Sequence, residues 1–402
     1  MNRENFLKEH APCYIYNQRE IIDQCNKLKT ALKDFKFLYS IKTNPFPAVV
    51  HEVYEQGFGS DAASANEVRI SADSGMSPNQ IFYSAPGKTD RDIIECYGKC
   101  VMTADSFWDI HRMNKEAENR GEILKIAVRI NPNFSMTDEV GNPAKFGIDE
   151  DRLPELEKVL SECFNVEMIG IHVHVRSQIL DYKLIGQYYI RCFKLAQKIN
   201  NLENVNIEFI NFGSGIGALY DKAKDKPVDL EKLSEMVVEI VRENKETLNA
   251  ELYIETGRFV VCNAGTYYTR IVDIKVSHGK KYLIVQNGMN GFLRPTISNM
   301  LNKMKAAGEL SLTEQEPLYT KENEFEVRIL NNSKKIEKVD IVGNLCTSMD
   351  IICEDKELPY AEIGDIVEIT NAGSYAYSLS PLFFASHDLP GEYYSLIDGN
   401  IL

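Results

Sequence analysis

A single lysine, Lys42, stands at the end of a short apolar segment and directly before turn residues. The preceding residues 37–41 predict a buried strand, and Asn44-Pro45 predict a turn after it. Burial disfavours the ammonium form and lowers a lysine pKa, which favours an amine that can form a Schiff base with a carbonyl group. An isolated strand-end lysine is more often a surface side chain whose ammonium reaches water, so its interpretation depends on the rest of the chain.

A glycine-rich segment, Gly213-Ser214-Gly215-Ile216-Gly217, follows a later predicted strand. Closely spaced glycines let backbone N–H groups approach a phosphate without interference from a Cβ atom. Tight turns use the same residues, so the segment alone does not separate the two interpretations. Its place after the seventh of eight predicted strands favours phosphate, because (β/α)8 barrels commonly bind phosphate there.

Glu255-Thr256-Gly257-Arg258 closes another predicted strand, and His172 and His174 lie on one face of a third. A carboxylate facing a pyridine nitrogen keeps that nitrogen protonated, and Arg258 suits a phosphate or a substrate carboxylate. The alternative is an ordinary Glu–Arg ion pair. The two histidines lack a third metal ligand at useful spacing. We therefore favour stacking of one imidazole on a cofactor ring, with the other as a core or hydrogen-bonding residue.

The elements that must position these residues alternate between strand-like and helical patterns. Predicted strands lie at 35–42, 59–64, 80–85, 100–104, 125–131, 168–175, 207–212 and 251–255. Eight strands alternating with helices predict an α/β fold of the (β/α)8 type, whose active site lies at the carboxyl ends of the strands. A doubly wound sheet is the main competitor, but it would need a phosphate turn after its first strand.

Polar residues close these apolar segments at the same end. They are Lys42, Asp61, Ser64, Ser84, Asp105, Arg129, His174, Gly213, Ser214, Gly215 and Glu255. In a barrel they converge on one cleft, where an amine, a phosphate loop and a carboxylate together favour pyridoxal 5'-phosphate (PLP) as the cofactor.

After residue 262 the pattern changes to alternating segments at 266–276, 281–286, 325–331, 337–343 and 366–370. These predict an antiparallel β domain joined by the N-terminal strand. We expect a barrel over residues 28–262 and a β domain over 1–27 and 263–402. The long polar loop at 132–150 has the length of a functional lid.

Composition narrows the class of protein. A net charge of −14 argues against nucleic acids and anionic membranes as partners, and no segment resembles a membrane span or a signal peptide. Nine scattered cysteines match no metal-binding pattern and favour reduced thiols in the cytoplasm. In the C-terminal part, Cys346 could protonate a carbanion or be a small buried residue, and Tyr375 could reach a phosphate or pack in the core.

Six segments in this order resemble the fold-type III PLP-dependent decarboxylases, with the diaminopimelate decarboxylases and their relatives most similar. They are Tyr39-Ser40-Ile41-Lys42-Thr43-Asn44, residues 170–178, the glycine loop, Glu255-Thr256-Gly257-Arg258, Cys346-Thr347-Ser348-Met349-Asp350 and Ala372-Gly373-Ser374-Tyr375. The resemblance implies a PLP-binding barrel plus a β domain, assembled as a homodimer with shared active sites.

By resemblance, Lys42 is the Schiff-base lysine, His174 the stacking imidazole, Glu255 the partner of the pyridine nitrogen and Cys346 the proton donor from the partner subunit. The implied cofactor contacts are Arg129, Ser177, Gly213, Ser214, Gly215, Gly257, Arg258 and Tyr375. The implied substrate contacts are Arg258, Arg294, Ser298, Thr347, Asp350 and Tyr375, with Arg294 gripping a distal carboxylate.

Two departures concern the substrate. Diaminopimelate decarboxylases usually have Glu where this chain has Thr347, and Tyr where it has Ser298. The Cys-Thr-x-x-Asp pattern instead resembles a branch of siderophore and antibiotic biosynthesis that acts on larger amino-acid conjugates, including carrier-bound ones. Arg176 and Ser214 also stand where the family usually has glycine, close to the implied phosphate site.

We therefore expect a cytoplasmic PLP-dependent decarboxylase of an amino acid or a carrier-bound conjugate. Diaminopimelate decarboxylase itself is an alternative that Thr347 and Ser298 oppose. A racemase of the alanine racemase type would place arginine opposite the ring nitrogen, which Glu255 opposes. A catalytically silent PLP-binding or regulatory homologue is a further alternative, opposed by the intact Lys42, Glu255 and Cys346.

Overall fold

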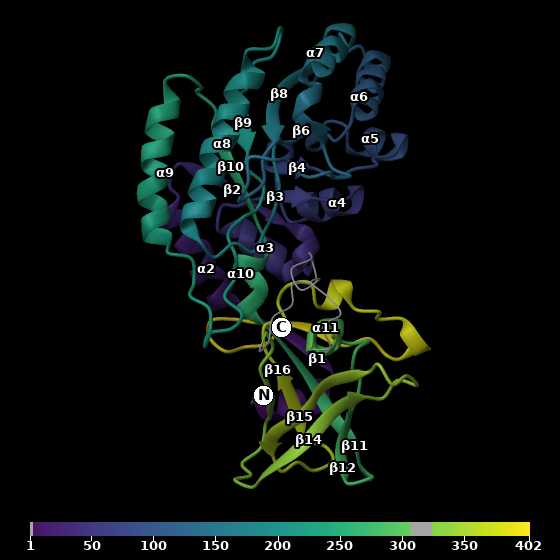
Figure 1. Ribbon diagram of the computed structural model, residues 1–402. Coiled ribbons are helices and arrows are strands. Elements are labelled where there is room, and N and C mark those ends of the chain that lie inside the picture. Colours follow the sequence, from purple (N-terminus) through teal and green to yellow (C-terminus); the bar gives the residue numbers. More distant parts are fainter. Residues whose placement is uncertain (1–2, 307–323) are drawn as a thin grey trace. The chain divides into compact units, whose positions relative to one another are not determined.

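The computed structural model describes residues 3–306 and 324–402, which form two compact units (Figure 1). The barrel unit comprises Ile22–Gly217 and Pro227–Gly257. The β unit comprises Met1–Ile21, Ala218–Lys226 and Arg258–Leu402. The sequence predicts a cofactor-binding barrel over residues 28–262. This functional boundary stays a prediction.

Eight parallel strands close into a barrel, as the sequence predicts. They are β2 Phe35–Ser40, β3 Gly59–Ala62, β4 Ile81–Tyr83, β5 Val101–Ala104, β6 Leu124–Asn131, β8 Val166–His172, β9 Phe209–Asn211 and β10 Glu251–Thr256. All neighbouring pairs are parallel, and the pairing of β5 with β6 completes the ring. The short β7, Ile148–Asp149, adds to the end of β6.

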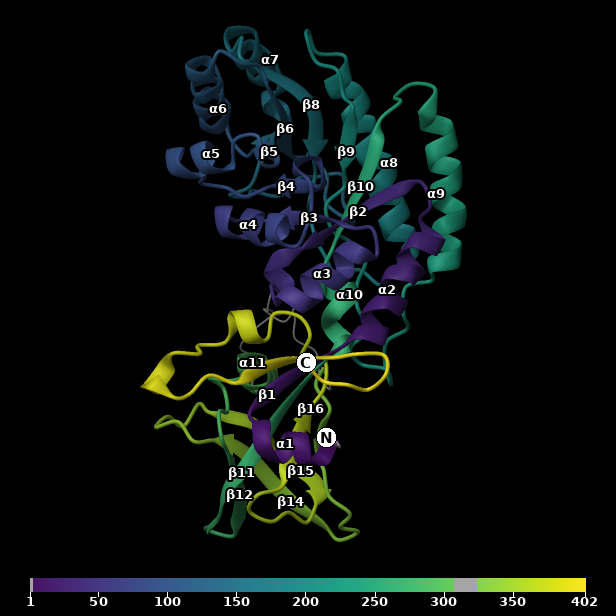
Figure 2. The same cartoon turned by 180° about the vertical axis from the view of Figure 1, so that it is seen from behind.

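Helices lie outside the strands of the barrel (Figures 1 and 2). They are α2 Gln18–Ala31, α3 Pro47–Glu55, α4 Ala65–Asp73, α5 Asp90–Cys96, α6 Phe107–Arg120, α7 Leu153–Glu162, α8 Tyr182–Asn200 and α9 Leu230–Lys245. Several begin at a side chain that accepts a backbone N–H of the first turn, as Ser64, Thr89 and Ser106 do for α4, α5 and α6. These caps fix where each helix begins, shortly after the preceding strand. The polar residues at the ends of the strands are thereby held in position.

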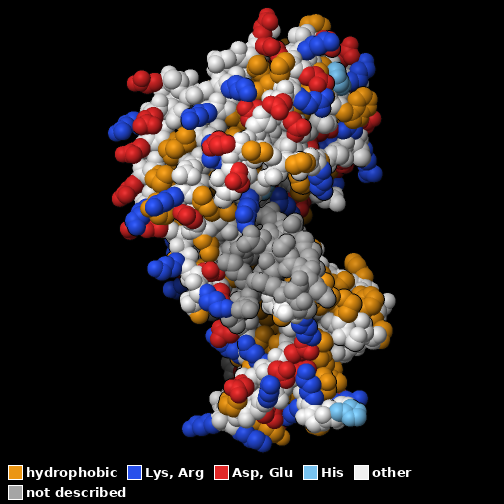
Figure 3. Space-filling view, in the orientation of Figure 1, with side chains coloured by type: hydrophobic (Ala, Val, Ile, Leu, Met, Phe, Trp, Pro, Cys, Tyr) orange, Lys and Arg blue, Asp and Glu red, His pale blue; other side chains and the backbone are white. Residues whose placement is uncertain are grey.

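Large side chains fill the inside of the barrel. Leu38, Phe82, Ala127, Ile169, Phe209 and Tyr253 pack together there, each from a different strand. Acidic and basic side chains are interspersed over the surface of this unit seen in Figure 3. Among the described residues, no helix combines the length and the apolar character that crossing a membrane requires.

A mixed sheet builds the β unit. Its strands are β1 Cys13–Asn17, β11 Gly265–Ser277, β12 Lys280–Val285, β13 Val327–Ile329, β14 Ile336–Gly343, β15 Ile351–Pro359, β16 Ile366–Ile369 and β17 Gly391–Ser395. The N-terminal strand β1 joins this sheet beside β11, as expected. Most pairings are antiparallel, but β12 pairs with β14, and β1 with β17, in parallel.

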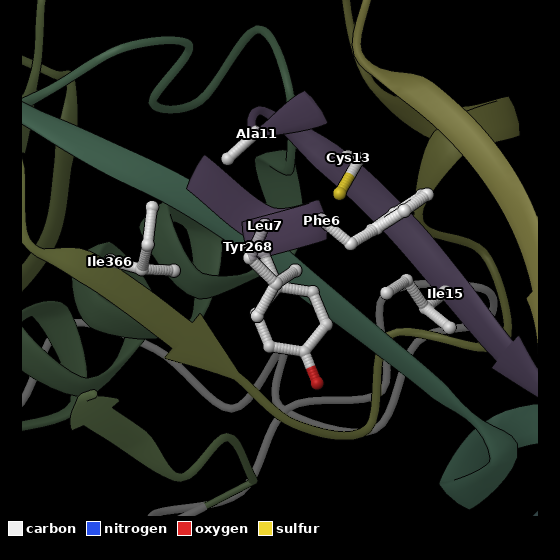
Figure 4. Packing of buried hydrophobic residues seen from close by; sticks show 7 residues of the cluster. All are labelled: Phe6, Leu7, Ala11, Cys13, Ile15, Tyr268 and Ile366. Carbon is white, nitrogen blue, oxygen red and sulfur yellow. The ribbon is translucent and has the colours of Figure 1, made fainter. Parts of the chain in front are cut away.

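The first helix of the chain, α1 (Arg3–His10), closes one side of this sheet. Its Phe6 and Leu7 pack with Cys13, Tyr268 and Ile366 from β1, β11 and β16 (Figure 4). Segments far apart in the sequence therefore share this small core.

The segment 287–310 contains a helix, α11 (Leu293–Ala306), and its residues 307–310 lie outside the described residues. The short helix α10, Arg258–Val261, follows β10. The long loop after β6 is tied to α8, because the guanidinium of Arg191 donates to the carbonyl oxygens of Ser135 and Asp138 and pairs with Glu139. Its predicted role as a lid stays a prediction.

Candidate active site

Lys42 lies directly after β2 in a single turn of 3-10 helix, Ile41–Thr43. Its Nζ atom is 3.2 Å from Oδ2 of Asp61, and the other oxygen of Asp61 accepts a 2.6 Å hydrogen bond from the hydroxyl of Ser84. Asp61 is fully buried, whereas the Lys42 side chain is 46% exposed. The expectation of a buried Lys42 is therefore wrong, because nearly half of its side chain is exposed while its ammonium contacts a buried carboxylate.

The chain does bury a lysine, at a different place. Lys88 is 2% exposed, and its ammonium donates to the carbonyl oxygens of Ala85 and Thr103 and lies 3.5 Å from Asp109. Burial lowers the pKa of Lys88, and Asp109 opposes this effect. Its hydrogen bonds to the backbone fit a structural lysine better than a reactive one.

Glu255 is buried near the end of β10, with the side chains of two neighbouring strands against it. The amide Nδ2 of Asn211 donates to Oε1 of Glu255 over 2.9 Å, and Nε2 of His172 lies 3.1 Å from the same oxygen. Burial opposes the charge of Glu255, but the contact with His172 outweighs it and holds the pKa of this carboxyl below its ordinary value. A buried, ionised carboxylate is what a protonated pyridine nitrogen requires as a partner.

Gly213 begins the glycine loop in the left-handed region, with φ at +64°. A Cβ atom there would come within 2.5 Å of the Val173 carbonyl oxygen and 2.7 Å of Cβ of His174. The next N–H, from Ser214, donates to Nδ1 of His174 over 3.0 Å, so the loop fixes the orientation of the imidazole. The Asn211 side chain accepts the N–H of Gly213, which ties the loop to β9.

The segment that carries Ser177 runs beside the glycine loop. The N–H of Ile179 donates to the carbonyl of Gly215, and the N–H of Gly217 donates back to Ile179. Gly257 allows a similarly close approach to the lysine turn, because a Cβ atom there would lie 2.4 Å from the methyl group of Thr43. The backbone is thus closely packed at Ser177, the glycine loop and Gly257. A phosphate-binding site requires such a close approach of the backbone.

Arg129, near the end of β6, is buried with its Nη1 atom 3.8 Å from Oδ1 of Asp105. Its guanidinium also lies 4.5 Å from the ring centre of Phe146 in the long loop. The polar side chains at the strand ends of the barrel unit therefore contact one another. They form pairs or triads that link neighbouring strands.

Arg258 and Tyr375, expected at the cofactor, belong to the β unit. The guanidinium of Arg258 stacks on the Tyr375 ring at 4.7 Å and donates to the hydroxyl of Tyr220 over 2.6 Å. Arg294 is completely buried beside it, where it donates to the Ser374 carbonyl oxygen and forms an ion pair with Glu324. The roles of Arg258, Tyr375 and Arg294 toward cofactor or substrate stay predictions.

Cys346 is exposed in the loop between β14 and β15, and Thr347 is next to it. Asp350, expected to contact the substrate, is 2% exposed. Its carboxylate accepts the N–H groups of Met289 and Leu345 over 2.6 and 3.0 Å. This geometry makes Asp350 an organiser of the thiol loop. Ser298 lies buried one turn past Arg294 on α11.

Sequence reasoning missed the part played by Asn211, and it also missed Glu67. Asn211 lies two residues before Gly213, and an amide at the end of a barrel strand was a usable signal. Glu67 accepts the Ala63 N–H over 2.7 Å, and Ser64 accepts the Glu67 N–H, a pairing that the Ser-x-x-Glu spacing indicates. Burial raises the pKa of Glu67 to about 7.

Residues 18–262 match the model of the family described as pyridoxal-dependent decarboxylase, pyridoxal binding domain. That is more than half of the chain, and the chain belongs to this family. It is a PLP-dependent amino-acid decarboxylase, and the predicted cofactor and reaction class are confirmed.

Two curated relatives resemble nearly the whole chain. Diaminopimelate decarboxylase of Aquifex aeolicus is 27% identical over 93% of this chain and 85% of its own length. L-glutamyl-[BtrI acyl-carrier protein] decarboxylase of Niallia circulans is 28% identical over 95% and 88%. Among solved structures, diaminopimelate decarboxylase of Helicobacter pylori in complex with L-lysine has a TM-score of 0.82 at 24% identity, with 100% of this chain and 95% of that chain covered. This last likeness shows the fold.

The barrel unit offers PLP a set of groups that fits it. Lys42 supplies an accessible amine, the glycine loop supplies backbone that a Cβ atom would obstruct, and Glu255 supplies a buried carboxylate. The imidazole of His174, held by Ser214, supplies a flat surface. Amine, phosphate cradle, ring partner and stacking surface all come from strand ends of one barrel.

Proposed function

We propose that this decarboxylase acts on an amino-acid conjugate, such as a carrier-bound or citryl-linked amino acid, in siderophore or antibiotic biosynthesis. The observation that carries the proposal is the pair Thr347 and Ser298, which replace the glutamate and tyrosine usual in diaminopimelate decarboxylases. A site that lacks a carboxylate partner for a distal ammonium loses discrimination for meso-diaminopimelate. The similarity to the glutamyl-carrier decarboxylase of Niallia circulans supports the same substrate class.

The described contacts agree with a changed distal site. The hydroxyl of Thr347 accepts the N–H of Met349 within its own loop, so it is already engaged locally. Arg294 faces Glu324, so part of the charge that would attract a distal carboxylate is neutralised inside the β unit. Both observations weaken recognition of a free dicarboxylic diamino acid.

In the proposed reaction, Lys42 would hold the cofactor through its aldehyde group, and Asp61 keeps the Lys42 amine in place. PLP supplies an electron sink for the bond to the α-carboxylate when it is bound. Glu255 would pair with the ring nitrogen, His174 would stack on the ring, and the glycine loop at 213–215 would lie against the phosphate. Cys346 or a water molecule would return a proton to Cα.

The test is CO2 release from a panel of substrates by the purified holoenzyme. The panel holds meso-diaminopimelate, L-glutamate, L-glutamyl carrier protein and citryl-diaminopropionate. We expect a kcat/KM at least about tenfold higher for one of the conjugates than for meso-diaminopimelate. A preference for meso-diaminopimelate would overturn the proposed substrate class while leaving the decarboxylase assignment intact.

Diaminopimelate decarboxylase is the second candidate function. Several relatives at 25–27% identity carry that name, including those of Aquifex aeolicus and Zymomonas mobilis. The double variant Thr347→Glu with Ser298→Tyr discriminates the candidates. If the natural residues divert the enzyme from meso-diaminopimelate, this variant gains activity on it; if the enzyme is already a diaminopimelate decarboxylase, the variant gains nothing.

We also propose a homodimer whose active sites combine Lys42 of one subunit with Cys346 of the other. The support is the resemblance of the Cys346 segment to the family's proton-donor loop. Inactive Lys42→Ala and Cys346→Ala variants, mixed and allowed to exchange subunits, would regain about a quarter of the wild-type activity if sites are shared. No regain despite proven exchange would contradict shared sites, and light scattering measures the mass directly.

A further inference from the structure

Two buried side chains converge on one oxygen of Glu255. His172 from β8 and Asn211 from β9 occupy paired positions on adjacent strands, and both contact Oε1 of Glu255 on β10. His172 is 2% exposed and Asn211 is fully buried. Both groups therefore fix the same oxygen, Oε1, of the carboxylate.

Asn211 also determines which way its own amide points. Its Oδ1 accepts the N–H of Gly213 over 2.9 Å, so Nδ2 must face Glu255. The carbonyl of Gly213 in turn accepts the N–H of Glu255. One asparagine therefore links the acid to the glycine loop.

The imidazole of His172 lies against Glu255. Burial lowers the pKa of His172, which favours the neutral ring, and its proton is placed on Nε2 because that nitrogen faces Oε1 of Glu255 at 3.1 Å. Nε2 lies at hydrogen-bond distance from Oε1 but outside ideal alignment. Such bonds often align fully only when the ligand is bound.

We propose that His172 and Asn211 are positioning residues that keep Glu255 ionised and turn its Oε2 toward the ring nitrogen of PLP. The inference rests on the proposed role of Glu255 and extends it to two residues on neighbouring strands. Two donors to a carboxylate favour its charged form. A carboxylate held in one orientation also keeps the lone pairs of Oε2 directed toward the ring nitrogen. A metal role for His172 is not supported, because residues 3–306 and 324–402 contain no cluster of three His, Cys, Asp or Glu side chains able to hold a metal ion.

Removal of the His172 donor should raise the pKa of Glu255. The charged or titratable groups that face the pair are Lys42, Asp61, Arg129, His174 and Tyr188, and none of them is altered in a His172 variant. The carboxylate would then be lost at higher pH than in the natural enzyme. The acid limb of kcat, and the pH at which the visible absorbance of the bound cofactor changes, should both move upward.

The experiment compares His172→Phe, which removes the donor, with His172→Gln, which restores an N–H. We expect His172→Phe to shift the acid limb and the spectral titration of the resting holoenzyme upward by about one pH unit, with kcat lowered about tenfold and KM little changed. His172→Gln should recover most of both effects. His111→Phe, at the histidine of α6 beside Cys163, is the control and should change neither.

Glu255→Gln separates this inference from the proposed function. If Glu255→Gln changes the spectrum and His172→Phe does not, the inference is wrong and the role of Glu255 stands. If Glu255→Gln itself leaves spectrum and kcat unchanged, the proposed role of Glu255 fails. Should His172→Phe not fold, Asn211→Ser supplies the same test, with an upward shift expected and with weaker PLP retention on dialysis; an unshifted titration in a folded Asn211→Ser protein overturns the inference.

Discussion

The barrel unit and the β unit both bury charged side chains, but they stabilise them differently. In the barrel unit, Glu255 is held by groups from adjacent parallel strands. In the β unit, Arg258 and Arg294 share the Tyr220 hydroxyl, and Glu324 comes from a distant segment of the chain. Regular strand geometry brings the first set together, whereas loop conformation brings the second. Strand pairing therefore positions the buried carboxylate of the barrel unit, whereas loop conformation positions the buried arginines of the β unit.

The largest expected effect is at the barrel. Lys42→Ala should abolish the covalent attachment of PLP and lower kcat/KM at least about a thousandfold. Borohydride reduction followed by mass spectrometry of peptides locates the label, which we expect on Lys42. Lys36→Ala is the matched control, because Lys36 lies on β2, the strand just before Lys42, in an exposed ion pair with Glu251. A label on another lysine in the natural enzyme would contradict the assignment.

The next effect tests the β unit. Glu324→Gln leaves the fully buried Arg294 without its anionic partner, and we expect a loss of about 3–5 kcal/mol in the free energy of unfolding. Chemical denaturation measures it. The exposed pair of Arg328 with Glu326 serves as control and should contribute about 0–1 kcal/mol. A small loss for Glu324→Gln would mean that the buried Arg294 does not depend on Glu324 for its stability.

Asp350→Ala should have a smaller effect on stability and a local effect on the thiol loop. The variant leaves two buried N–H groups, of Met289 and Leu345, without their acceptor, which costs about 1–3 kcal/mol. The rate of Cys346 alkylation by iodoacetamide should change as the loop loosens. Unchanged stability and alkylation would show that the loop holds itself without Asp350.

The smallest effect concerns pH. Burial raises the pKa of Glu67 from 4.5 to about 7, so the folded state binds its proton more tightly than the unfolded chain. The resulting stability is fully present below pH 4.5 and is lost as the pH rises toward about 7. Glu67→Gln should remove about 1–3 kcal/mol of this pH dependence, measured by denaturation at pH 5 and pH 8. Glu55→Gln, at an exposed glutamate of α3, should leave it unchanged.

The sequence allowed prediction of the barrel and its polar strand ends, because strand order and parallel pairing bring carboxyl ends together whatever the loops do. It misjudged Lys42, since a turn of 3-10 helix lifts the lysine out of the strand, while the buried lysine is Lys88. It could not find Glu324 beside Arg294, because no local pattern reports a contact between a helix and a loop.

Asp350 was predicted as a substrate contact from its motif, yet the structure engages its carboxylate with backbone N–H groups. The motif spacing indicated the loop but did not indicate the direction of the Asp350 side chain. A Cβ atom on Gly288 or Gly343 would come within 2.2 Å of this carboxylate. Such close packing cannot be deduced from composition or periodicity.

The pairing of β1 with β11 and β17 has a consequence for synthesis of the chain. A ribosome delivers Phe6 and Leu7 long before Tyr268 and Ile366, against which they pack. The barrel strands are nearly continuous in sequence. They can assemble before the apolar face of the first helix is covered. The apolar contacts of the first helix are therefore completed only after most of the chain has been synthesised.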